Sequence, residues 1–178
     1  MSHKQRRFFI ITVSIAVIGL FFTALFVITD GKRNAAVPLP VHALPELVFK
    51  NYDGQEVHTG QFKGRPMLIN AWASWCPFCE REFVDFVALQ KEFGDRIVII
   101  AVNRGEPLDA ARTYTDGLGI TKDLLFVLDQ ADSFYRSVGG FSMPESVFVD
   151  ASGIIRDHKR GPMDALEMHR RVEQAFSL

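Results

Sequence analysis

Cys76 and Cys79 are the only two cysteines in the chain, and two residues separate them. A C-x-x-C pair suits reversible disulfide chemistry, because one thiolate attacks a partner disulfide and the second thiol resolves the mixed disulfide. The pair follows a compact apolar segment, Met67 to Trp72, and opens a segment of helical period, Pro77 to Phe93. We therefore expect it at a helix N-terminus, where unpaired N–H groups lower the pKa of a thiol.

The order of the two cysteines predicts their roles. Cys76 is expected to be the exposed, attacking sulfur, and Cys79, one turn further into the helix, the buried, resolving sulfur. Pro77 suits the first helical turn, where its missing N–H costs nothing. The pair is thus read as a redox centre.

Three alternatives exist for the pair: a structural disulfide, half of a zinc site, and two unreactive core cysteines. A structural disulfide across so short a loop removes little entropy from the unfolded chain. A zinc site needs two more ligands, and the five histidines are scattered without metal-type spacing. Redox chemistry is the favoured interpretation, and no metal or organic cofactor is implied.

Strand and helix patterns alternate around the pair, which predicts an α/β domain with a mixed central sheet flanked by helices. A hairpin is expected around Asp53-Gly54, and Arg96 to Val102 completes a βαβ unit. The other expected elements are a helix at 107–115, strands at 124–128, 146–149 and 153–156, and a helix at 164–176.

The N-terminal segment 8–29 has no charged side chain and would span about 33 Å as a helix, enough to cross a bilayer. It is followed by charged residues rather than by small residues suited to cleavage, which favours an uncleaved anchor. Basic residues at 4, 6 and 7 predict a cytoplasmic N-terminus, residues 1–7, and an extracytoplasmic domain, residues 46–178. Residues 30–45, rich in proline, read as a linker.

Charge excludes one broad class of function. The chain has 20 Lys and Arg residues against 21 Asp and Glu residues, so it lacks the basic balance of a general nucleic-acid-binding protein.

Three stretches carry a family resemblance: Asn70 to Glu82, Met143 to Ser146, and Val149 to Ile155. In these the chain resembles the membrane-anchored, extracytoplasmic thioredoxins of the TlpA/ResA and CcmG (DsbE) type. The resemblance implies a thioredoxin-like fold and reduction of protein disulfides, possibly those of apocytochrome c. It also implies a membrane electron donor of the DsbD/CcdA type.

The resemblance also assigns roles to single residues. It implies that Pro144 is a cis-proline facing the redox pair, in a substrate groove shared with Met143 and Trp75. Glu82 lies three residues after Cys79, on the same helical face, and is expected to relay a proton to or from its sulfur. The alternative for Glu82 is an acid that complements the helix dipole.

Phe78 bears on the direction of electron flow. It offers no charge to stabilise the thiolate, unlike a histidine at this position, which favours a reductant over a strong oxidase. A second function stays open, a copper(I) carrier that binds through Cys76, Cys79 and the thioether of Met143.

Overall fold

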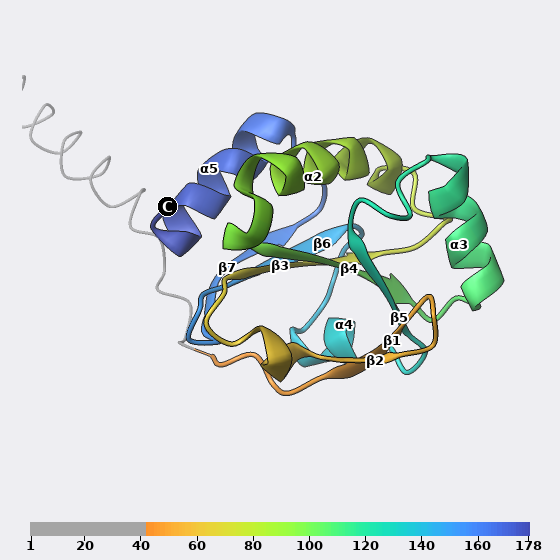
Figure 1. The fold of residues 1–178 in the computed structure, drawn as a ribbon, viewed down its shortest axis with the longest axis horizontal. Helices are drawn as coiled ribbons and strands as arrows, with labels where there is room; N and C mark the ends of the chain where they lie inside the picture. The colour runs from red at the N-terminus through yellow and green to blue at the C-terminus, as the bar shows by residue number, and fades with distance from the viewer. Residues whose placement is uncertain (1–41) are drawn as a thin grey trace, which may run out of the picture. The chain divides into compact units, whose positions relative to one another are not determined.

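The computed structural model describes residues 42–178, which form a seven-stranded sheet in the order β2-β1-β5-β4-β3-β6-β7 (Figure 1). Strands β3, β4 and β5 are parallel, and the other neighbouring pairs are antiparallel, so the sheet is mixed as predicted. The strands are β1 (Val48–Asn51), β2 (Glu56–His58), β3 (Met67–Trp72), β4 (Val98–Arg104), β5 (Leu125–Asp129), β6 (Glu145–Val149) and β7 (Ile155–Arg160).

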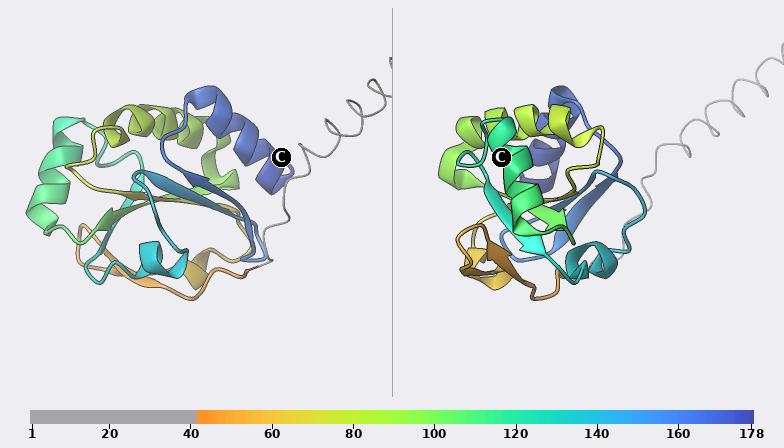
Figure 2. Two further views of the ribbon diagram at one scale, coloured as in Figure 1. Left: turned by 180° about the vertical axis from the view of Figure 1, so that it is seen from behind. Right: turned by 90° about the vertical axis from the view of Figure 1, so that its right-hand side faces the viewer.

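Helices cover both faces of this sheet (Figure 2). Helices α2 and α5 lie on one face, and the short α4 lies on the other (Figures 1 and 2). The helices are α2 (Cys79–Phe93), α3 (Leu108–Gly117), α4 (Ser133–Ser137) and α5 (Ala165–Phe176), with 3-10 turns η1 (Thr59–Phe62) and η2 (Gly94–Arg96).

The central strand β3 separates two apolar clusters because its side chains alternate between the faces. Leu68 and Trp72 pack in the cluster under α2 and α5, whereas Ile69 and Ala71 pack in the cluster under α4. All six residues of β3 are buried, which explains why the strand reads as a continuous apolar run. Asn70, the polar residue in this run, has the same parity as Leu68 and Trp72 and faces α2.

Most observed elements overlap the predicted ones, although β7 (Ile155–Arg160) begins two residues later and ends four residues later than the strand predicted at 153–156. β3 has the predicted bounds, and Asp164, predicted to begin the last helix, is the N-cap of α5, with its side chain accepting the Glu167 N–H at 2.8 Å. The helix α4 was not predicted, because its five residues are too few to show a helical period.

The predicted cytoplasmic segment 1–7 and membrane anchor 8–29 lie outside the described residues. From residue 42 to the C-terminus, no helix has the length and apolar content that a membrane crossing requires. The end of the predicted linker is described, and it pairs with the residues just before β7. Ala43 and Ile154 form a β-bridge, and the Leu44 N–H donates to the Gly153 carbonyl at 2.9 Å.

Candidate functional site

Cys76, in the connection between β3 and α2, forms a disulfide with Cys79, the first residue of α2, and their Cα atoms are 5.6 Å apart. The connection is tightened by two backbone hydrogen bonds, from Cys76 N–H to the Ala73 carbonyl at 3.1 Å and from Cys79 N–H to the Cys76 carbonyl at 3.3 Å. The pair therefore stands at the carboxyl end of a central parallel strand, where α/β sheets commonly place their functional residues.

Two details of the prediction for this cysteine pair are wrong: the exposure of Cys76 and the position of Pro77. Cys76 is not exposed, since 2% of its surface is accessible against 1% for Cys79. The turn between Ala73 and Cys79 folds both cysteines into the apolar cluster that contains Trp72 and Phe83. In addition, α2 begins at Cys79, so Pro77 precedes the helix instead of occupying its first turn.

Exposed aromatic side chains flank this buried disulfide. Trp75 is 60% exposed and Phe78 is 49% exposed, although both are large and apolar. Exposed apolar residues of this size, side by side with a reactive group, are typical of a surface that meets another molecule. The predicted position of Trp75 at the edge of the site is consistent with this placement.

The Met143–Pro144 peptide bond is cis, as the resemblance implied. Pro144 is buried directly before β6, and β6 pairs with β3 so that Ala71 faces Glu145. One residue further along this register, Pro144 is level with Trp72, at the start of the connection that carries the cysteines. Met143 is partly buried and packs against both apolar clusters.

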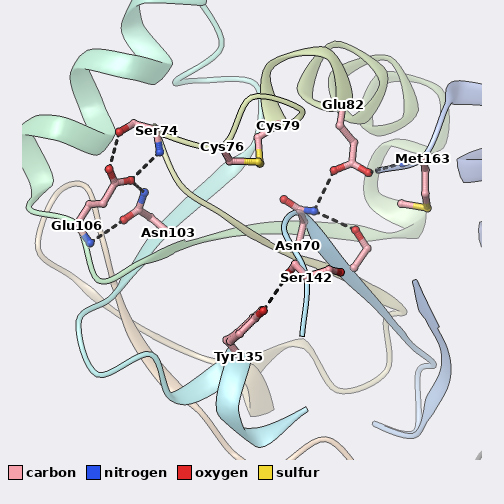
Figure 3. Close-up of a disulfide and its surroundings, with 11 residues drawn as sticks. Asn70, Ser74, Cys76, Cys79, Glu82, Asn103, Glu106, Tyr135, Ser142 and Met163 are labelled. Atoms are coloured by element: carbon pink, nitrogen blue, oxygen red, sulfur yellow. Dashed lines mark hydrogen bonds between the residues drawn. A yellow bond between two sulfur atoms is a disulfide. The ribbon is translucent and has the colours of Figure 1, made fainter. Parts of the chain in front are cut away.

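Glu82 occupies a buried polar network under α2 and is 2% exposed. Its carboxylate accepts hydrogen bonds from the Met163 N–H at 3.0 Å and from Asn70 Nδ2 at 3.3 Å. Asn70 Nδ2 also donates to Ser146 Oγ of β6 at 2.9 Å. Figure 3 shows Glu82, Asn70 and Met163 on one side of the disulfide.

Burial raises the pKa of Glu82 from 4.5 to about 7, because the ionised carboxylate loses its hydration. The hydrogen bonds from Met163 and Asn70 favour the charged form and oppose this rise without cancelling it. Glu82 can therefore both take up and release a proton near neutral pH, which is what proton exchange with a thiol requires.

A second network, which sequence reasoning missed, lies on the other side of the disulfide (Figure 3). Glu106 accepts the Ser74 N–H at 2.7 Å and the Ser74 hydroxyl at 2.5 Å. It also accepts Asn103 Nδ2 at 2.7 Å. Glu106 follows the carboxyl end of β4, the strand next to β3. Its position could have indicated a role at the site, because polar residues at the carboxyl ends of parallel strands often belong to functional sites.

Comparison with known proteins decides the family. Residues 40–175, more than half of the chain, match the family model described as Redoxin. The chain belongs to the redoxin family.

Two curated relatives of this redoxin have names that specify chemistry. The chain is 32% identical to the thiol:disulfide interchange protein DsbE of Allochromatium vinosum, over 72% of the chain and 67% of the relative. It is 26% identical to the thiol-disulfide oxidoreductase ResA of Geobacillus kaustophilus, over 97% of the chain and 98% of the relative. Among solved structures, MTB dsbF superposes with a TM-score of 0.69 at 25% identity, covering 76% of this chain and 99% of that one.

The disulfide and these relatives define the activity class: this redoxin is a thiol–disulfide oxidoreductase. The structural neighbours share its thioredoxin-like α/β fold, which the resemblance had predicted.

The copper(I) alternative gains no additional ligands from the described residues. Between residues 42 and 178, no group of three or more His, Cys, Asp or Glu side chains is placed to hold a metal ion. A copper site would thus depend on the reduced Cys76 and Cys79 with Met143. Titration of the reduced protein with copper(I) against a competing chelator tests this alternative.

Replacing Glu106 with glutamine is expected to loosen the loop that precedes Cys76. One carboxylate oxygen becomes an amide N–H₂, so at least one of the three donors from Ser74 and Asn103 loses its acceptor. We expect the free energy of unfolding to fall by about 2 kcal/mol in urea titrations. Asp95→Asn, on the exposed η2 turn, is the control and should change the free energy of unfolding by less than about 0.5 kcal/mol. An equal change in both variants would contradict the role of Glu106 in holding this loop.

Proposed function

We propose that this redoxin reduces disulfides of extracytoplasmic proteins, including the haem-site cysteines of apocytochrome c. The observation that carries the proposal is a disulfide set beside the cis Met143–Pro144 bond and bordered by exposed Trp75 and Phe78. An extended segment around a partner's cysteine fits such a border, because apolar contacts can hold it while the sulfurs exchange.

The proposed cycle begins with the dithiol form. The Cys76 thiolate attacks one sulfur of the partner disulfide, forms a mixed disulfide and releases the other partner sulfur as a thiolate. The Cys79 thiol then loses its proton, and its thiolate attacks Cys76 and releases the second partner thiolate. Two electrons pass to the partner, which takes up two protons, and the Cys76–Cys79 disulfide remains.

Glu82 is the proposed acceptor of the Cys79 proton. The two residues are three positions apart on α2, so they lie on the same face of the helix. The raised pKa of Glu82, about 7, makes its carboxylate basic enough to take a proton near neutral pH. Trp75, Met143 and Pro144 are the proposed substrate-binding residues.

The direction of electron flow rests on Phe78. Its phenyl ring brings no positive charge to the pair, so the thiolate gains no extra stabilisation and the dithiol form remains a good reductant. The proposal further places the chain in the cytoplasmic membrane through residues 8–29, with the N-terminus inside and the redox domain outside. A membrane donor of the DsbD/CcdA type would then return two electrons to the disulfide.

A peptide with an oxidised C-x-x-C-H sequence tests the direction. The reduced full-length chain in detergent should reduce this peptide, and alkylation followed by mass spectrometry should show two free thiols on the peptide and a disulfide on the protein. The matched reverse reaction combines the oxidised chain with the reduced peptide. At equilibrium it should convert a fraction of the peptide at least about tenfold smaller than the forward reaction does. Preferred oxidation of the peptide would contradict the proposal.

A further inference from the structure

The connection between α4 and β6 carries the cis-proline, and one buried carboxylate holds it. Glu145, the first residue of β6, is 1% exposed. Its Oε2 atom accepts the backbone N–H of Phe141 at 2.9 Å and that of Ser142 at 3.0 Å. A single carboxylate oxygen thereby fixes two successive peptide groups just before the Met143–Pro144 bond.

The other oxygen of Glu145 is fixed by β7. Oε1 lies 2.5 Å from His158 Nε2 and 3.4 Å from Arg160 Nε. The β6–β7 register pairs Glu145 with Arg160 and Val147 with His158, so alternate residues of both strands meet on the same face. The residues of β7 therefore fix the carboxylate of Glu145, and this carboxylate fixes the loop before Met143.

This network is separate from the Glu82 network. Val147 and Val149, which have the same parity as Glu145 along β6, pack in the apolar cluster under α4. Glu82 belongs to α2, on the opposite face of the sheet. A change at Glu145 should therefore leave the proposed proton acceptor in place.

The segment that Glu145 holds leads into Met143, which packs against the apolar cluster that contains Cys76 and Cys79. Phe141 is 85% exposed, and Met143 is partly buried. Tyr135 of α4 supports the same segment, because its hydroxyl donates to the Ser142 carbonyl at 3.1 Å (Figure 3). The segment is thus fixed at two points, and its most apolar side chain is left in solvent.

We propose that Glu145 is a positioning residue that fixes Phe141 and Met143 for docking of the partner polypeptide. This inference rests on the proposed function, since it assigns the loop a place in partner binding. Ordering the loop in advance lowers the entropy that docking would otherwise cost. The sulfur chemistry itself does not require the loop, so a small disulfide should react without its help.

Glu145→Gln tests the proposal. Glutamine has the same shape as glutamate, but it has one oxygen and one NH₂ group in place of two oxygens, so it cannot accept hydrogen bonds at both positions. Two second-order rate constants are measured with the reduced full-length chain: one for the oxidised C-x-x-C-H peptide and one for the small disulfide dithiobis(nitrobenzoate). We expect the peptide rate to fall about tenfold and the small-disulfide rate to change less than about twofold. The Asp95→Asn control should leave both rates unchanged.

Two further variants keep the test decisive if the glutamine variant folds poorly. Tyr135→Phe removes the second support of the loop and should also slow only the peptide reaction. Phe141→Ala removes the docking side chain itself, so adding Glu145→Gln to it should cost little more, because both act through one segment.

Equal slowing of both disulfides, no slowing of the peptide, or additive effects with Phe141→Ala would overturn the positioning role. A wild-type chain that reacts with dithiobis(nitrobenzoate) but not with the peptide would overturn the proposed reduction of protein disulfides, and the positioning role would fall with it.

Discussion

Cys79→Ala is expected to arrest the cycle at the mixed disulfide, whereas Cys76→Ala is expected to prevent the cycle from starting. Without Cys79, the bond between Cys76 and the partner has no internal thiol to resolve it. The Cys79→Ala chain should therefore accumulate as a covalent adduct with the oxidised peptide, and turnover should fall by about three orders of magnitude. Non-reducing gels and intact-mass measurements detect the adduct.

The two cysteine variants serve as controls for each other. Both cysteines are buried in the same apolar cluster, so each alanine removes one sulfur from a similar environment. If the Cys76→Ala chain formed the adduct and the Cys79→Ala chain did not, Cys79 would be the attacking sulfur. That reversal would contradict the proposed mechanism while leaving the redox pair intact.

Glu82→Gln is expected to change how stability depends on pH. The pKa of Glu82 is about 7 in the fold against 4.5 in an unfolded chain, so the fold favours the neutral form. This contribution is fully present below pH 4.5 and is lost as the pH rises through 7. The wild-type free energy of unfolding should fall by about 3 kcal/mol across this window relative to the variant, in urea titrations from pH 4 to pH 8.

The same substitution should slow the resolving step. A carboxylate that accepts the Cys79 proton contributes a rate factor of about a hundred, which glutamine cannot supply. In the wild type this step should also accelerate as the pH rises through about 7, the pKa of Glu82, and in the variant this titration should disappear. Stopped-flow measurement of mixed-disulfide decay provides both results.

Glutamine is a suitable replacement because the network can accommodate it. Asn70 Oδ1 is buried without a hydrogen-bond partner, and rotation of the Asn70 amide would offer this oxygen to the glutamine N–H₂. A variant that is stable at pH 8 and still resolves the mixed disulfide at the wild-type rate would show that Glu82 serves only the helix N-terminus.

Patterns of apolar residues were sufficient to predict most of the fold. The predicted strand Met67–Trp72 matches β3 because every residue of β3 is buried, and a turn at Asp150–Gly153 joins β6 to β7. The cis Met143–Pro144 bond was implied by family resemblance, because no local pattern distinguishes it from a trans bond.

What the sequence did not reveal depends on contacts between distant residues. Cys76 was expected to be exposed, but its burial follows from the turn back to Ala73 and from packing against residues that lie elsewhere in the chain. Glu106 meets Ser74 across 32 positions of sequence, and only the parallel pairing of β3 and β4 brings them together. The role of a buried acid such as Glu145 appears only when the strand register is known.

The reduction potential of the Cys76–Cys79 disulfide tests the central claim most directly. The full-length chain is equilibrated in glutathione and dithiothreitol buffers at pH 7, and its free thiols are counted after alkylation. A membrane-tethered reductant should have a potential of about −200 mV or lower, near or below that of the glutathione couple. A potential near about −120 mV would contradict the account, because a dithiol so stable in its reduced form introduces disulfides into its partners.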